Sequence, residues 1–307
     1  MALPEVTTDA GAAAARLLAT AIGNVERVPS FAGNRVFKAS TGAGEIYLKF
    51  GAAEATAAEH AALSVAAQLG IPVPTVAAVD LDGKLTGSPC IATYQVDGQP
   101  MSGDEPLFSE VAPLLERLHR VEVNGFGQLA LAEDGGLRGE DSSWLVTLQR
   151  RTHAARLAVG AGLVPGPLVD AVAAAVEAQP WGALEGSRLV HGDFHPRHVY
   201  ADHGQITAII DWGDATAGDP DYDIARILHS ALLRSNLSSA IAIAAKAVPL
   251  SQRDMDPRRL RTLLTYAAVF ILWSMHGELE GGAPWPPWWP IQTKALERVL
   301  DALATTL

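Results

Sequence analysis

The spacing of apolar residues predicts strands in the first hundred residues of the chain. Ile46, Leu48 and Phe50 alternate with Tyr47 and Lys49, which is the pattern of a strand with one buried face. Lys49 therefore lies on the face opposite the apolar stripe. The predicted strands of this part are 25–28, 35–39, 45–50, 73–80 and 88–96.

Helical patterns dominate the rest of the chain. Segments rich in alanine and leucine predict helices at 9–22, 52–69, 107–121, 144–159, 168–179, 222–233, 240–247, 257–278 and 293–304. Residues 125–141 are rich in glycine and acidic residues and are predicted to form a loop or an insert. Residues 187–210 read as a strand, a polar loop and two further strands joined by a turn at 202–205. Residues 281–290 hold three tryptophans among four prolines, which predicts a rigid aromatic loop.

The composition limits the class of protein. The 307 residues are 49% hydrophobic and 19% charged, which is enough apolar material for one large domain or two lobes. A net charge of −11 argues against a nucleic-acid partner, because phosphate binding requires basic surface. The same charge is compatible with a cationic small molecule, and also with an acidic surface that only favours solubility.

Compartment and membrane contact follow from the same sequence. Cys90 is the single cysteine, so an intramolecular disulfide is excluded and a reducing compartment is expected. The N-terminus has no basic segment before an apolar run, and the most apolar run, 263–275, is shorter than the roughly 20 residues of a membrane span. A cytoplasmic protein without a membrane partner is therefore expected.

Two aspartates suggest the chemistry. Asp193 lies in a polar loop between two apolar segments, and Asp211 ends the next apolar segment directly before Trp212. Phosphoryl transfer uses such a pair, since one carboxylate accepts the proton of the attacking hydroxyl and the other holds the metal. A second hypothesis is a zinc hydrolase, with ligands among His191, His195, His198 and the two aspartates. Pro196 argues against the single helical face that this zinc site would need.

Four short segments resemble the signature of the aminoglycoside phosphotransferase and choline kinase-like family. They are His191-Gly192-Asp193, Asp211-Trp212, Gly218-Asp219-Pro220 and Asp223-Ile224-Ala225. The family form is H-G-D-x-x-x-x-N, so His198 stands where the family has a metal-binding asparagine. The family's macrolide kinases look similar at that position. The resemblance extends in order over nearly the whole chain.

The resemblance implies an α+β fold with two lobes, like that of protein kinases. A nucleotide-binding lobe at 1–96 would contain an antiparallel sheet and one helix, and a mainly helical lobe at 97–307 would carry the catalytic and substrate-binding residues. The implied cofactors are ATP or GTP and Mg²⁺. Residues 30–35 would correspond to the loop that covers the phosphates.

The resemblance also implies roles for single residues. Asp193 would be the catalytic base, and Asp211 and His198 would hold the metal. Lys49 would bind the nucleotide and pair with Glu59, with Glu54 as the competing partner. The backbone near Thr93 and Gln95 would meet the base, while His119, Asp219 and Asp223 would serve the structure.

The implied substrate is the hydroxyl of an antibiotic, with an aminoglycoside favoured and a macrolide, a cyclic peptide antibiotic or a metabolite alcohol as alternatives. The acid excess favours a cationic substrate held by Asp141, Asp214, Glu278 and Glu280. If His198 cannot serve the metal, the chain would be a nucleotide-binding pseudokinase. The sequence leaves the oligomeric state open.

Overall fold

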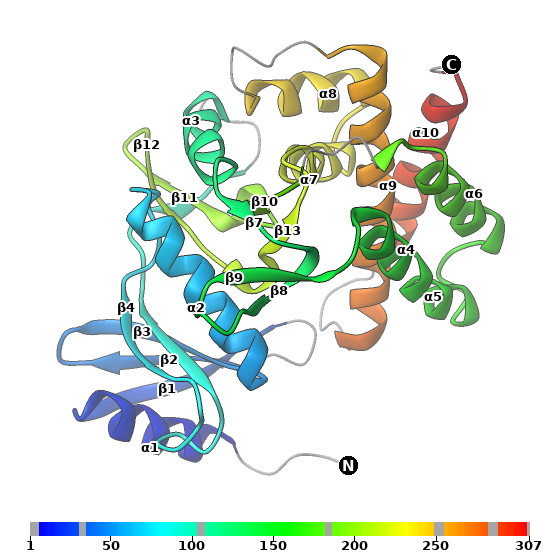
Figure 1. The fold of residues 1–307 in the computed structure, drawn as a ribbon. Coiled ribbons are helices and arrows are strands. Elements are labelled where there is room, and N and C mark those ends of the chain that lie inside the picture. Colours follow the sequence, from blue (N-terminus) through cyan, green and yellow to red (C-terminus); the bar gives the residue numbers. More distant parts are fainter. Residues whose placement is uncertain are drawn as a thin grey trace.

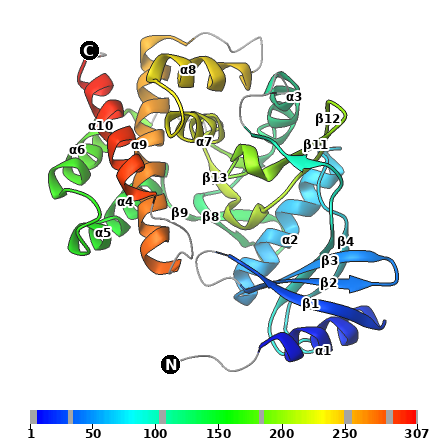
Figure 2. The same ribbon diagram turned by 180° about the vertical axis from the view of Figure 1, so that it is seen from behind.

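The structure is a computed structural model that describes residues 6–30, 35–102, 108–181, 186–248, 255–281 and 288–305. It confirms the predicted α+β fold with two lobes, a small lobe rich in strands and a larger one rich in helices (Figure 1). Seen from behind, the long helix α9 (Pro257–Gly281) runs through the large lobe beside α7 and α10 (Figure 2). None of the helices in the described ranges is long and apolar enough to cross a membrane.

The small lobe is a five-stranded antiparallel sheet in the order β1-β2-β3-β5-β4. Its strands are β1 (Ile22–Val28), β2 (Arg35–Thr41), β3 (Gly44–Phe50), β4 (Val76–Asp80) and β5 (Cys90–Tyr94). The apolar residues of β3 are buried as predicted, and Phe37, Ile46 and Leu48 pack against alanines of helix α1 (Val6–Leu18). The helix predicted at 9–22 corresponds to α1, so the lobe contains two helices, one more than the resemblance implied, because the sheet needs a cover on its apolar face.

Helix α2 (Ala53–Gln68) joins the two lobes. Ala62, Leu63 and Ala66 belong to the same buried cluster as the apolar residues of the large lobe. The helix contacts strand β8 (Phe126–Leu131) and the short 3-10 helix η3 (Trp212–Asp214). Its alanine-rich sequence permits close approach, so that Glu59 is brought next to the segment containing Asp211.

The large lobe contains two further sheets, both formed by antiparallel pairs. One has the order β7-β10-β13-β8-β9 and the other the order β12-β11-β6. The remaining strands are β6 (Gln99–Pro100), β7 (Glu122–Val123), β9 (Leu137–Asp141), β10 (Ser187–Val190), β11 (Val199–Asp202), β12 (Gln205–Ile209) and β13 (Thr216–Gly218). Strand β6 pairs with β11, so the chain has joined the large lobe by residue 99. The boundary between residues 96 and 97 stays a prediction.

The segment 125–141 is a hairpin of β8 and β9, and its prediction as a loop or insert was wrong. The close approach of the two strands requires glycine at positions 125, 127 and 139. A Cβ on Gly125 would lie 2.4 Å from the carbonyl oxygen of Gly139, and a Cβ on Gly127 would lie 2.3 Å from Oδ2 of Asp141. Glycine-rich composition therefore marks tight pairing here, where it had suggested irregular chain.

The helices of the large lobe surround a core of large aromatic residues. They are α3 (Phe108–Leu118), α4 (Trp144–Ala154), α5 (Arg156–Gly160), α6 (Gly166–Glu177), α7 (Asp221–Leu232), α8 (Leu237–Lys246), α9 and α10 (Trp289–Thr305). The predicted helix at 144–159 is thus two helices that meet at Ala155. The indole N–H of Trp144 donates to the hydroxyl of Tyr266 (2.7 Å), which in turn donates to Asp219 (2.7 Å).

Candidate active site

A buried carboxylate fixes the loop that carries Asp193. Asp223, on the first turn of α7, accepts hydrogen bonds from the backbone N–H groups of His191 and Gly192, each at 2.9 Å. Nε2 of His119 lies 2.9 Å from the same carboxylate. Three partners hold Asp223 in place, so the chain leaving β10 has a defined direction and Asp193 a defined position.

Gly192 brings the loop against η3. Its φ is +79°, and a Cβ on it would lie 1.9 Å from the carbonyl oxygen of Asp214, a backbone atom that cannot move aside. Only glycine fits this position. The close approach places Asp193 and Asp211 on the same wall of the site.

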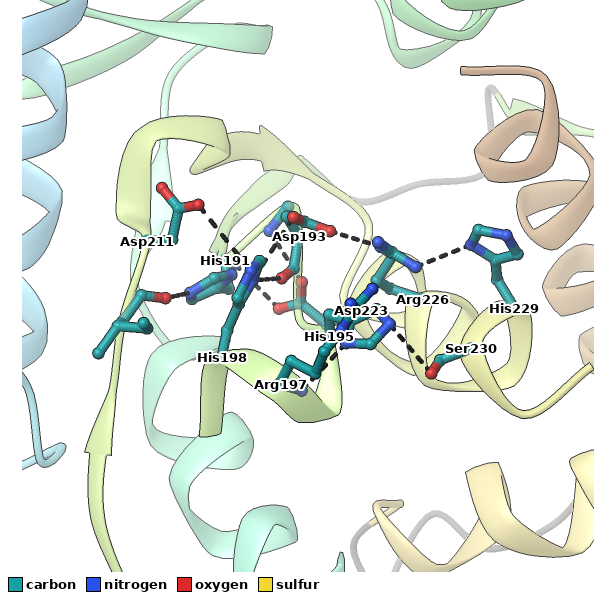
Figure 3. Close-up of polar contacts among 12 residues, drawn as sticks. His191, Asp193, His195, Arg197, His198, Asp211, Asp223, Arg226, His229 and Ser230 are labelled. Carbon is teal, nitrogen blue, oxygen red and sulfur yellow. Dashed lines mark hydrogen bonds and ion pairs between the residues drawn. The ribbon is translucent and has the colours of Figure 1, made fainter. Parts of the chain in front are cut away.

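Asp193 is ionised and firmly oriented. Nε of Arg226 donates to its Oδ1 at 2.5 Å, and Nη1 of Arg226 lies 2.8 Å from Nδ1 of His229 (Figure 3). Burial alone would raise the pKa of Asp193, but the neighbouring Arg226 and His198 hold this pKa well below its usual range. The carboxylate can therefore orient a hydroxyl and accept its proton late, which suits a loose phosphoryl transition state.

Lys49 links the lobes through two carboxylates. Its Nζ lies 2.9 Å from Oε1 of Glu59 and 2.9 Å from Oδ1 of Asp211. Burial would lower the pKa of Lys49, but the charges of Asp211 and Glu59 raise it, so the ammonium is retained. Glu54 is exposed in the first turn of α2 and is not the partner of Lys49.

The backbone of Asp211 adopts the left-handed conformation, with φ +62° and ψ +65°. This conformation is unusual for a residue other than glycine and is found at constrained functional sites.

His198 faces both aspartates. Its Nδ1 lies 2.9 Å from the backbone oxygen of Asp193 and 3.5 Å from Oδ2 of the same residue. Its Nε2 lies 3.9 Å from Oδ2 of Asp211. Ligand atoms of Asp193, His198 and Asp211 lie within 4.8 Å of one another. A proton on Nδ1 that is donated to the Asp193 carbonyl leaves Nε2 as a lone-pair donor, so two carboxylates and one nitrogen fit a divalent ion.

The alternative zinc site is not formed by the three histidines. Nε2 of His191 bonds to the carbonyl oxygen of Ile210 (2.9 Å), and Nδ1 of His195 accepts from the N–H of Arg197 (3.0 Å). These contacts cap and brace the loop, which turns through the 3-10 helix η2 (Pro196–His198). Within the described ranges, only His198 of the three contributes to the cluster of possible metal ligands.

The four acidic residues predicted to hold substrate have different surroundings. Asp141 is buried, accepts from Thr147 (2.8 Å) and pairs with Arg150 (2.5 Å), so the structure gives it a structural role in place of the predicted contact with substrate. Asp214 is exposed, and desolvation together with the charges of Asp193 and Asp211 raises its pKa. Glu278 and Glu280 lie in the last turns of α9, and their side chains are outside the described part.

Of the two residues predicted to meet the nucleotide base, Thr93 lies in strand β5 and Gln95 directly follows that strand. Thr93 pairs with Tyr47 in the sheet, and the N–H of Gln95 donates to the carbonyl oxygen of Glu45 (2.9 Å). That N–H is therefore used within the sheet and is closed to a nucleotide base. Of the predicted phosphate-covering loop, residues 31–34 lie outside the described residues.

Sequence reasoning missed Arg226 and His229. Arg226 follows Asp223 by three positions on α7, and residues three apart share one helix face. Because Asp223 was expected to brace the catalytic loop, that spacing was the signal that Arg226 also faces the loop. The contact of His229 with Arg226 has the same spacing.

These features together define a kinase-like phosphotransferase: a lysine and glutamate pair in a five-stranded lobe, facing two aspartates of a helical lobe. Residues 24–263 match the phosphotransferase enzyme family (APH), and the chain belongs to this family. It is accordingly a transferase that uses an alcohol group as acceptor.

Curated and solved relatives agree with this assignment. A stretch of 43 residues is 49% identical to hygromycin-B 4-O-kinase of Escherichia coli. This stretch makes up 14% of this chain and 13% of that kinase. A ternary complex of aminoglycoside phosphotransferase APH(4)-Ia with ADP and hygromycin B has a TM-score of 0.66 at 17% identity, over 93% of this chain and 95% of that one. Macrolide 2'-phosphotransferase MphH of Brachybacterium faecium has a TM-score of 0.58 at 18% identity, over 94% of this chain and 98% of that one.

Proposed function

We propose that this protein transfers the terminal phosphoryl group of ATP or GTP to a hydroxyl of an antibiotic, and so confers resistance. The observation that carries the proposal is the convergence of Lys49, Asp211 and Asp193. Lys49 reaches Asp211 across the lobe boundary, and His198 lies between Asp211 and Asp193. ATP is favoured over GTP by the complexes of APH(4)-Ia with ADP and with AMP-PNP.

The residues of the site divide the work of the reaction. The ammonium of Lys49 would meet the nucleotide phosphates, and Glu59 would keep it aimed at them. Asp193, held by Arg226, would orient the acceptor hydroxyl in line with the terminal phosphate and take its proton. The backbone near Thr93 would contact the base, and the Gln95 carbonyl remains a candidate for the same contact.

Asp211 and His198 would hold a magnesium ion, with Asp193 close by. When bound, the ion would supply positive charge that neutralises the phosphates. Carboxylate oxygen suits magnesium well, and an imidazole nitrogen suits it less well. The site is therefore expected to depend more on Asp211 than on His198.

An aminoglycoside is the first candidate acceptor. The segment shared with hygromycin-B 4-O-kinase supports it. Asp214 also supports it, because this exposed residue is within electrostatic range of Asp193 and Asp211, and its carboxylate would pair with an amino group of the acceptor. Glu278 and Glu280 stay proposed contacts. A macrolide is the second candidate, because His198 occupies the position at which the family's macrolide kinases also depart from asparagine.

A nucleotide-consumption screen tests this function. Purified protein with ATP or GTP and Mg²⁺ is offered aminoglycosides, macrolides, cyclic peptide antibiotics and amino alcohols, with Asp193→Asn as the inactive control. We expect one class to stimulate nucleotide use and to gain the mass of one phosphoryl group. For a cationic acceptor, apparent affinity should weaken as ionic strength rises. Nucleotide binding without transfer to any acceptor in the panel would count against the antibiotic assignment.

A further inference from the structure

Arg226 contacts the catalytic aspartate with one nitrogen and a histidine with another. Its Nε donates to Oδ1 of Asp193 at 2.5 Å, and its Nη1 lies 2.8 Å from Nδ1 of His229. Figure 3 shows Arg226 between these two residues. Arg226 and His229 are three positions apart on α7, so they share one face of that helix. Asp193 is therefore linked to His229 through a single guanidinium group.

The contact with Arg226 determines where His229 carries its proton. A guanidinium group only donates hydrogen bonds, so Nδ1 of His229 must accept through its lone pair. The proton of the neutral ring then lies on Nε2. A second proton on Nδ1 would remove this acceptor and would place two positive charges side by side. Burial of the ring and the charge of Arg226 both lower the pKa of His229 well below its usual range, which agrees with a neutral ring.

One phenyl ring supports both side chains. The guanidinium carbon of Arg226 lies 5.5 Å from the centroid of the Phe270 ring. The ring of His229 is nearly parallel to the same phenyl ring, at an angle of 5° and with the centroids 6.3 Å apart. Arg226 is thus held by a carboxylate, an imidazole and an aromatic ring. These three contacts give its guanidinium one defined position, and they position Oδ1 of Asp193 with it.

Stability alone does not explain a histidine at position 229. The side chain is buried, and its Nε2 has no hydrogen-bond partner among the residues that the structure describes. A buried N–H without a partner lowers the free energy of unfolding, and an apolar side chain of similar size would avoid this loss. A residue that only packed against Phe270 would therefore be better apolar. The lone pair of Nδ1 is the one feature that an apolar residue cannot supply to Arg226.

We propose that neutral His229 is a positioning residue for the catalytic base: its Nδ1 lone pair holds Arg226, and Arg226 holds Oδ1 of Asp193. With Oδ1 engaged, Oδ2 of Asp193 is the oxygen left for the acceptor hydroxyl. In the transfer step the hydroxyl oxygen bonds to the terminal phosphorus, the bond from that phosphorus to the bridging oxygen breaks, and the hydroxyl proton goes to Oδ2. His229 itself exchanges no proton. Its role in catalysis rests on the proposed function, whereas its contact with Arg226 does not.

Kinetics of single variants test the role of His229 with an acceptor from the screen. His229→Leu is similar in size but has no acceptor, so kcat should fall about tenfold, because small misplacements of reacting groups cost up to about 10²-fold in rate. The KM for nucleotide should stay near that of wild type, which also shows that the variant is folded. His229→Asn offers an amide oxygen near the place of Nδ1 and should recover most of kcat. The control is His153→Leu, at an exposed position of α4. Wild-type kcat in His229→Leu, or an equal loss in His229→Leu and His229→Asn, would overturn the proposal.

A double variant shows whether His229 acts through Arg226. Arg226→Met removes the guanidinium group, so His229→Leu in that background should cause no further loss of kcat. A packing role would give independent losses that multiply in the double variant. That result would also overturn the proposal.

Nitrogen NMR of the histidine side chains tests the contact without turnover. The signals of His229 in the full chain are assigned by their absence from His229→Asn. At neutral pH they should show an uncharged ring with its proton on Nε2. A charged ring, or a proton on Nδ1, would contradict the proposal whatever reaction the protein catalyses. The expected ring state in a protein that transfers phosphate to no acceptor would instead count against the proposed function.

Discussion

Nζ of Lys49 lies 2.9 Å from Oδ1 of Asp211, although 162 positions separate the two residues in the sequence. This contact joins a central strand of the small lobe to the segment that follows β12 in the large lobe. Glu59 lies equally close to the same ammonium. When a nucleotide binds, its phosphates would compete with the carboxylate of Asp211 for the ammonium of Lys49. The position of Nζ should therefore govern nucleotide affinity.

Gly213→Ala should weaken nucleotide binding. A Cβ at this position would lie 2.5 Å from Nζ of Lys49 and 3.2 Å from Oε2 of Glu59. The ammonium is held by two carboxylates and must shift to make room, so we expect the Kd for ATP to rise about tenfold, or ~1.4 kcal/mol. Calorimetric titration measures the effect. Gly160→Ala, where no atom lies within 4 Å of the added Cβ, is the matched control. Equal affinity in both variants would contradict the prediction.

Asp193→Asn should remove turnover and keep nucleotide binding. The amide cannot accept the hydroxyl proton, and loss of a general base typically costs about 10²–10⁴-fold in rate. Asp193 contacts Arg226 and His198 but not Lys49 in the described structure, so affinity for the nucleotide should stay close to that of wild type. Single-turnover transfer at the wild-type rate would show that the base lies elsewhere. Asp202→Asn, on the exposed hairpin of β11 and β12, serves as the control.

Asp219→Asn should change how stability depends on pH. Desolvation and the neighbouring Asp221 raise the pKa of Asp219 to about 6 in the folded protein. The folded state then binds this proton more tightly than the unfolded state, so the contribution of Asp219 to stability falls as pH rises from about 4 to about 6. In wild type the backbone N–H of Asp221 donates to Oδ1 of Asp219 at 3.0 Å. The amide oxygen of asparagine can still accept this hydrogen bond. The melting temperature of the variant relative to wild type should therefore rise between pH 4 and pH 7. A constant difference over this range would refute the raised pKa.

Much of the site was predictable because it depends on local order. Alternation in β3 put Lys49 on the face away from the apolar stripe, and the spacing of Asp193, Asp211 and Asp223 follows one short strand-loop-strand unit and the helix after it. Periodicity also located most helices to within a few residues. Local patterns of this kind survive folding because each element buries the face that its sequence makes apolar.

Other features depended on contacts between distant segments, which a single sequence does not contain. Asp141 was expected to hold substrate, but Thr147 and Arg150 on the following helix take up its carboxylate. The hairpin of β8 and β9 was hidden by glycines that only the opposite strand makes necessary. Arg226 was overlooked because its importance comes from Asp193, 33 positions earlier in the chain.

His198→Asn should lower the magnesium requirement if His198 serves the metal. In the structure Nδ1 is engaged by the backbone oxygen of Asp193, and Nε2 points toward Asp211 at 3.9 Å. Magnesium prefers oxygen to nitrogen, so an asparagine that offers its amide oxygen should reduce the Mg²⁺ concentration for half-maximal activity. The ratio of activity with Mn²⁺ to activity with Mg²⁺ should fall, because manganese accepts imidazole more readily. His198→Ala, which offers no ligand, should raise the requirement for both ions. If the two variants both keep the metal requirement of wild type, His198 only braces the loop through Asp193 and the ion is held by the aspartates.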